Sequence, residues 1–122
     1  MILGTGCDIL NIKKVDKMYR KMGWSLPHQI LGHNELEVFA GLGNGQEMVY
    51  LARRYCAKEA FFKALGRKAD WRDVQVLNDA DGRPTLAFSG SLKEEMYSDR
   101  MFHVTISDSE EVVISFVTME AT

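Results

Sequence analysis

Residues 50–66, YLARRYCAKEAFFKALG, decide the fold that we expect for the whole chain. We predict a helix over residues 46–65, with Gly66 as its C-terminal cap. One stripe of it has the spacing of a core-facing helix: Met48, Ala52, Tyr55, Glu59 and Phe62. The carboxylate of Glu59 interrupts this stripe, and burying it is costly unless a cation, hydrogen bonds or a metal ion compensates. Either the buried stripe is rotated and Glu59 faces solvent, or a positive group lies against Glu59.

The composition predicts one domain over residues 1–122. A net charge of −2 argues against a general nucleic-acid-binding protein. Cys7 and Cys56 form no CxxC pair, so we expect two free thiols in the reducing cytoplasm rather than a zinc site or a disulfide. No apolar run approaches the roughly 18 residues that span a bilayer, and the first residues lack a signal-peptide pattern. We therefore expect a cytoplasmic protein without a membrane or nucleic-acid partner.

The first segment places a second carboxylate in an apolar setting. Residues 2–10, ILGTGCDIL, predict a strand, and Asp8 interrupts its apolar end. Asp8 could equally cap the next helix, which we predict over residues 12–22 with Gly23 as its stop. One arc of that helix is basic: Lys13, Lys14, Lys17, Arg20 and Lys21. Composition alone supports equally a solvated face and a docking site for an acidic partner.

The remaining pattern changes from helices to strands. We predict one or two short helices within residues 24–40, starting at Pro27 and Asn34, and a loop at residues 41–45 that lacks the Lys-Ser/Thr of a P-loop. Residues 74–77 and 85–88 predict a hairpin with Pro84 at a strand start, followed by a helix at 91–97. Strands follow at 102–107 and 112–119. This is the pattern of a small α+β domain, with its long central helix packed on an antiparallel sheet.

The two carboxylates and the cations around them suggest phosphate chemistry. Asp8 and Glu59 suit magnesium, which takes one or two protein carboxylates and completes its octahedron with substrate phosphates and water. Arg54 and Lys58 are one helical turn apart and can reach a single polyanion. The alternative for Glu59 and Lys63 is a simple i,i+4 surface pair worth a few tenths of a kcal/mol.

Four segments in this order resemble the holo-acyl-carrier-protein synthase family of 4′-phosphopantetheinyl transferases. They are GTGCDI at 4–9, ARRYCAKEAFFKALG at 52–66, NDADGRPTL at 78–86 and HVTISDSEEVVISFV at 103–117. The resemblance implies the phosphopantetheinyl transferase fold. It also implies transfer of 4′-phosphopantetheine from coenzyme A to a serine of apo-acyl-carrier protein, in fatty acid biosynthesis. The chain would be typically a homotrimer with sites at subunit interfaces.

The resemblance also implies roles for individual residues. Asp8 and Glu59 match the magnesium ligands, Glu59 and Lys63 match catalytic positions, and the serine proton would go to Glu59 or to a metal-bound water. Coenzyme A would contact a second set of residues: Arg54, Lys58, Lys63, Gly66, Arg67, Pro84 and Ser107. The acidic carrier protein would dock on the first helix, on Lys13, Lys14, Lys17, Met18 and Lys21.

Two departures and two rival functions accompany this resemblance. The family continues Gly-Thr-Gly-Ile after the central helix, whereas residues 67–71 read RKADW, so Arg67 and Lys68 would replace backbone contacts with charge. Asp108 stands where many members carry a histidine. One rival is a module that binds coenzyme A or carrier protein and has lost catalysis, although Asp8, Glu59 and Lys63 are intact. The other is an α+β domain of unrelated function, which leaves the four-segment match unexplained.

Overall fold

The structure, a computed structural model, describes residues 1–43 and 45–122. In chain order the elements are β1 (Ile2–Asn11), α1 (Ile12–Met22), α2 (Ser25–Ile30), α3 (His33–Ala40), α4 (Gln46–Leu65), the 3-10 helix η1 (Trp71–Asp73), β2 (Val74–Asn78), β3 (Pro84–Phe88), α5 (Leu92–Tyr97), β4 (Arg100–Asp108) and β5 (Val112–Ala121). The α+β prediction is confirmed. Of the loop predicted at 41–45, Asn44 lies outside the described residues.

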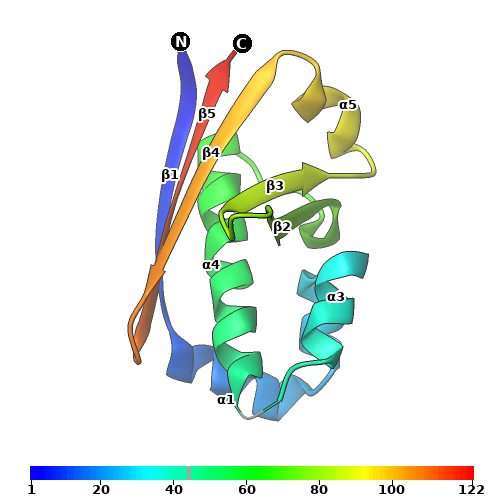
Figure 1. The fold of residues 1–122 in the computed structure, drawn as a ribbon, viewed down its shortest axis with the longest axis vertical. Helices are drawn as coiled ribbons and strands as arrows, with labels where there is room; N and C mark the ends of the chain where they lie inside the picture. Colours follow the sequence, from blue (N-terminus) through cyan, green and yellow to red (C-terminus); the bar gives the residue numbers. More distant parts are fainter. Residues whose placement is uncertain (44) are drawn as a thin grey trace.

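The central helix α4 lies between two layers (Figure 1). On one side is a three-stranded antiparallel sheet in the order β1-β5-β4. On the other side are α3 and the two-stranded hairpin β2-β3. Strand β5 shows the expected alternation, because Val113, Val117 and Met119 are buried while Phe116 is exposed. One face of the sheet therefore packs on α4 and the other is left uncovered in the single chain.

Two glycines allow α4 to lie directly against β1. A Cβ atom on Gly4 would be 2.0 Å from the carbonyl oxygen of Ala64, and one on Gly6 would be 1.9 Å from that of Ala60. Both distances are far below van der Waals contact, so only glycine fits at these positions. Asp8 is the next residue of β1 that faces α4, so the Gly-x-Gly-x-Asp spacing carries this carboxylate to the helix.

Most predicted elements are confirmed, including the bounds of α1 and α4. Gly66 caps α4 with φ +86°. The short helices begin at Ser25 and His33 rather than at Pro27 and Asn34. The alternative role of Asp8 as a helix cap is wrong, because the N-cap residue of α1 is Asn11.

The buried face of α4 is rotated from the stripe that we predicted. Its core side consists of small and apolar residues: Leu51, Ala52, Cys56, Ala57, Ala60, Phe61, Phe62 and Ala64. Tyr55 and Glu59 lie at the border of this face and are half-buried. On this face the backbone of Ala60 and Ala64 lies directly against the two glycines of β1.

Candidate active site

Lys63 of α4 pairs with Asp8, one of the two carboxylates that the sequence singled out. Its ammonium donates hydrogen bonds to Asp8 Oδ1 at 3.1 Å and to the Cys7 carbonyl oxygen at 2.9 Å. The hydrogen bond and charge of Asp8 raise the pKa of Lys63, and the charge of Glu59 adds to the effect. Asp8 is the more buried partner, with 17% of its side chain exposed against 54% for Lys63. The site thus holds a protonated lysine whose charge acts on both carboxylates.

Glu59 has its own cation from the segment that follows α4. Lys68 Nζ lies 3.5 Å from Glu59 Oε1, and 20% of the Glu59 side chain is exposed. Tyr55 lies near both carboxylates. Burial raises the pKa of its phenol, and the charges of Glu59 and Asp8 raise this pKa further. Both alternatives for Glu59 therefore hold in part: the buried stripe is rotated, and cations lie against the carboxylate.

The donor set of Asp8 and Glu59 fits a magnesium ion that is shared with a substrate. Both carboxylates are partly exposed, and each pairs with a lysine. Within the described ranges 1–43 and 45–122, no three or more His, Cys, Asp and Glu side chains gather as a metal cluster. Two carboxylates are what magnesium uses when substrate phosphates supply further ligands. The residues present therefore suit this cation, with the phosphates as partners.

The prediction that Lys58 contacts coenzyme A is wrong. Its side chain is fully buried, and its ammonium donates to Glu35 Oε1 at 2.6 Å, to the Ile30 carbonyl at 2.6 Å and to the Trp71 carbonyl at 2.9 Å. Burial lowers the pKa of Lys58, and the charge of Glu35 opposes that effect. All three donors are used inside the protein, so Lys58 has none left for a phosphate.

Glu35 is the buried partner that sequence reasoning missed. Its Oε1 also accepts a hydrogen bond from the Gly32 amide at 2.9 Å, and its Oε2 accepts one from the Val76 amide at 2.9 Å. The one available signal was its place three residues after Gly32 at the start of α3, where a glutamate commonly bonds back to the backbone. That pattern indicates a helix start and does not reveal a buried partner.

Arg54 differs from Lys58 because one of its donors is unsatisfied. Only 7% of the residue is exposed, and its guanidinium carbon lies 3.9 Å from the centre of the Tyr50 ring. Burial lowers the pKa of Arg54, and the charges of Tyr50 and Glu35 counteract this. Among the described residues, Arg54 Nε has no hydrogen-bond partner. Arg54 borders a cleft of about 380 Å³ with Arg53, so an anion remains a suitable ligand.

The other residues expected near coenzyme A lie on separate elements. Arg67 forms an ion pair with Glu95 of α5. Pro84 begins β3 and borders a cleft of about 410 Å³ between β3 and β4. Ser107 is exposed near the end of β4. Next to it, Asp108 forms an ion pair with Arg53, so this carboxylate already has a cation of its own.

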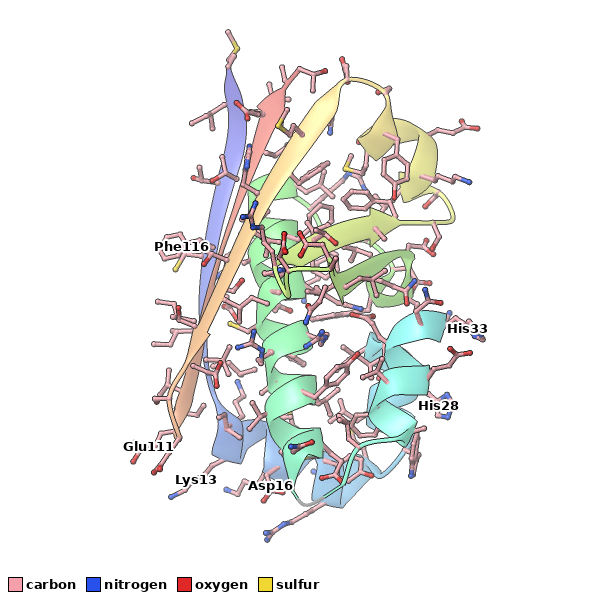
Figure 2. All side chains as sticks on the ribbon, viewed as in Figure 1. Lys13, Asp16, His28, His33, Glu111 and Phe116 are labelled. Carbon is pink, nitrogen blue, oxygen red and sulfur yellow. The ribbon has the colours of Figure 1, made fainter. Side chains whose placement is uncertain are left out.

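The basic arc of α1 forms an exposed surface at one end of the molecule. Lys13, Lys14, Lys17 and Lys21 are exposed, and Met18 is half-buried beside them. Arg20 instead pairs with Asp16 at 3.0 Å. The first three lysines border a cleft of about 790 Å³ together with Glu111, and Lys13, Asp16 and Glu111 lie at the same end in Figure 2.

The uncovered sheet face carries a group of exposed apolar side chains. Ile9 of β1 is 67% exposed and Phe116 of β5 is 51% exposed, and Figure 2 shows Phe116 on the side of the sheet away from α4. Cys7 lies opposite Phe116 in the strand register, and Ile9 lies opposite Ile114. Large exposed apolar patches on proteins are commonly protein or membrane interaction sites or ligand-binding grooves. As for membranes, none of the helices that the structure describes has the length and apolar character to cross one.

Comparison with known proteins agrees with this geometry. The family model of the 4′-phosphopantetheinyl transferase superfamily matches residues 4–117. A holo-[acyl-carrier-protein] synthase from Halalkalibacterium halodurans is 37% identical over 124 residues, which cover 98% of this chain and 97% of that protein. One from Polynucleobacter necessarius is 36% identical over 125 residues, covering 96% and 92%.

Solved structures give the same result. A holo-(acyl-carrier-protein) synthase from Bacillus anthracis, in complex with CoA (3',5'-ADP), has a TM-score of 0.85 and 32% identity, covering 100% of this chain and 99% of that one. The synthase from Neisseria meningitidis has a TM-score of 0.90 and 32% identity, covering 98% and 99%. The likeness therefore extends over the whole fold that positions the candidate site.

Proposed function

This chain belongs to the 4′-phosphopantetheinyl transferase superfamily, and on that premise we propose that it transfers the 4′-phosphopantetheine group of coenzyme A to a serine of apo-acyl-carrier protein. The observation that carries this proposal is the group formed by Asp8, Lys63 and Glu59, in which the Lys63 ammonium bonds to Asp8 and the charge of Glu59 further raises the pKa of Lys63. Fatty acid biosynthesis, which the resemblance implied, and the cytoplasm, which the sequence pattern suggested, are part of the same proposal.

In the proposed reaction, the serine oxygen forms a bond to the phosphorus that carries pantetheine. The bond from that phosphorus to the bridging oxygen breaks, and adenosine 3′,5′-bisphosphate leaves with the electron pair. We assign the serine proton to Glu59, whose carboxylate is partly exposed on α4. Lys63 offsets the charge that develops on the transferred phosphate, because the hydrogen bond to Asp8 keeps its ammonium protonated.

Asp8 and Glu59 are the residues that would hold magnesium. When bound, magnesium supplies positive charge to the diphosphate and to the leaving group. Lys63 pairs with Asp8 and Lys68 pairs with Glu59. Arg54 is a proposed phosphate contact through the cleft that it borders with Arg53, whereas Gly66, Arg67, Pro84 and Ser107 remain proposed contacts of coenzyme A on the family resemblance alone.

The carrier protein is proposed to dock on the exposed basic surface of α1. Its lysines face solvent, while the arginine beside them is already paired with Asp16. Replacing Lys14 and Lys17 by glutamate should therefore raise KM for the carrier protein far more than KM for coenzyme A. Equal changes in both KM values would argue against this docking site.

We also propose that three copies of the chain associate through the exposed sheet face. The apolar side chains Ile9, Cys7 and Phe116 would then be shielded from water.

The variant Glu59→Gln tests the proposed chemistry. It keeps the shape of the side chain but removes the charge, so magnesium-dependent transfer should be lost while the thermal unfolding temperature stays near that of the wild type. Lys93→Gln, a change at an exposed lysine of α5, serves as the control with full activity. Undiminished transfer by Glu59→Gln would overturn the assignment. If the chain were only a coenzyme A binding module, the wild-type protein would bind coenzyme A but would transfer no phosphopantetheine.

A further inference from the structure

The segment that follows α4 makes contacts that lead back to the candidate site. The indole of Trp71 lies across α4, with ring-centre distances of 5.0 Å to Tyr55 and 5.0 Å to Phe62. These two aromatic residues are one turn before and one turn after Glu59 on the helix. Trp71 is therefore fixed beside the position of the Glu59 carboxylate.

Trp71 in turn contacts Lys68. The Lys68 ammonium lies 5.7 Å from the centre of the indole ring, within the range of a cation–π contact. The same ammonium lies 3.5 Å from Glu59 Oε1. Lys68 has 72% of its side chain exposed, and a free lysine with that exposure samples many rotamers. The indole and the carboxylate together favour the rotamers that place the charge at the site.

The buried ion pair of Lys58 and Glu35 anchors the backbone of Trp71. The Lys58 ammonium donates to the Trp71 carbonyl at 2.9 Å, and Glu35 neutralises that ammonium at 2.6 Å. Both side chains have no exposed surface, so this anchor is shielded from solvent and salt. The series of contacts thus runs from the buried pair to Trp71, from its ring to Lys68, and from Lys68 to the catalytic carboxylate.

We propose that Lys68 binds the diphosphate of the substrate and that Trp71 is the residue that positions it. This inference rests on the proposed function, since it concerns how coenzyme A is held at that site. Lys68 supplies this charge from the segment that follows α4. The preorganised ring lowers the entropy lost when the lysine is fixed on the ligand.

A double-mutant cycle on coenzyme A binding tests the coupling. The full chain with magnesium is titrated with coenzyme A by calorimetry, as wild type, Lys68→Gln, Trp71→Leu and the combination of both. We expect each single change to raise Kd about tenfold, and the combination to raise it no further, because Trp71 acts through Lys68. Lys93→Gln is the matched control and should leave Kd unchanged, since Lys93 is exposed on α5.

Conservative variants separate positioning from folding. Trp71→Phe keeps an aromatic ring under the lysine and should restore Kd to within about twofold of the wild type. Thermal unfolding of every variant identifies any that does not fold. If a Trp71 variant does not fold, Lys68→Gln alone still tests whether Lys68 binds coenzyme A, because this exposed change does not disturb the core. Effects of the two single changes that simply add in the combination would overturn the positioning role. If Lys68→Gln leaves the Kd for coenzyme A unchanged, the whole inference is overturned. If the wild type does not bind coenzyme A at all, the proposed function is overturned as well.

Discussion

The replacement Lys58→Met removes the cation of the buried pair and should destabilise the protein strongly. Methionine fills a similar volume but leaves the Glu35 charge buried with only the amides of Gly32 and Val76, and the carbonyls of Ile30 and Trp71 lose their donor. Breaking a buried pair from one side costs about 3–5 kcal/mol. That is a large share of the roughly 5–15 kcal/mol of a typical domain. At about 4 °C per kcal/mol for a chain of this size, the unfolding temperature should fall by about 12–20 °C.

Urea unfolding followed by circular dichroism measures this change. Lys93→Met is the control, because the same substitution at an exposed lysine should change the free energy of unfolding by no more than about 0.5 kcal/mol. Combining Lys58→Met with Glu35→Met removes both charges and should recover about half of the loss, since the stranded backbone groups remain. A single variant as stable as the control would refute the reasoning, and so would a combination that shows no recovery.

Three further predictions concern the packing, a thiol and the sheet face. Gly6→Ala should cost at least about 2 kcal/mol and lower transfer, since its Cβ would lie 1.9 Å from the Ala60 carbonyl, while Gly43→Ala, with open space around it, should be neutral in the same urea assay. Burial raises the pKa of the Cys56 thiol to about 12. Above about pH 9 the unfolded chain therefore loses this proton first, and the free energy of unfolding should fall more steeply in the wild type than in Cys56→Ala, by up to about 1.4 kcal/mol per pH unit; equal slopes would contradict this. Phe116→Asp places a charge in the proposed subunit contact and should convert trimers to monomers in light scattering after size exclusion, and an unchanged mass would exclude that contact.

The fold followed from local signals because the glycines and the apolar periods agree with one another. Gly23 and Gly66 both have positive φ at helix ends, which is why the bounds of α1 and α4 were predictable. The close contact of Gly6 with Ala60 was not predictable, since no local pattern states which helix lies on which strand.

The family resemblance was enough to predict that Asp8, Glu59 and Lys63 belong to one site. The prediction failed for residues whose role depends on whether the side chain is buried. Arg54 and Lys58 are one turn apart and read as equivalent cations in the sequence, yet Lys58 has no exposed surface and Arg54 keeps an unsatisfied donor. The partner of Lys58 is 23 residues away on another helix, so its identity depends on tertiary packing. Lys68 next to Glu59 likewise depends on how the segment after α4 turns back.

The central claim is that this chain transfers phosphopantetheine, and intact mass spectrometry of an apo-acyl-carrier protein tests it most directly. The carrier is incubated with the wild-type chain, coenzyme A and magnesium, with and without EDTA. We predict that the carrier gains one phosphopantetheine group with magnesium and none with EDTA. A carrier whose mass stays unchanged with magnesium, under conditions where the chain is folded and binds coenzyme A, would contradict the account.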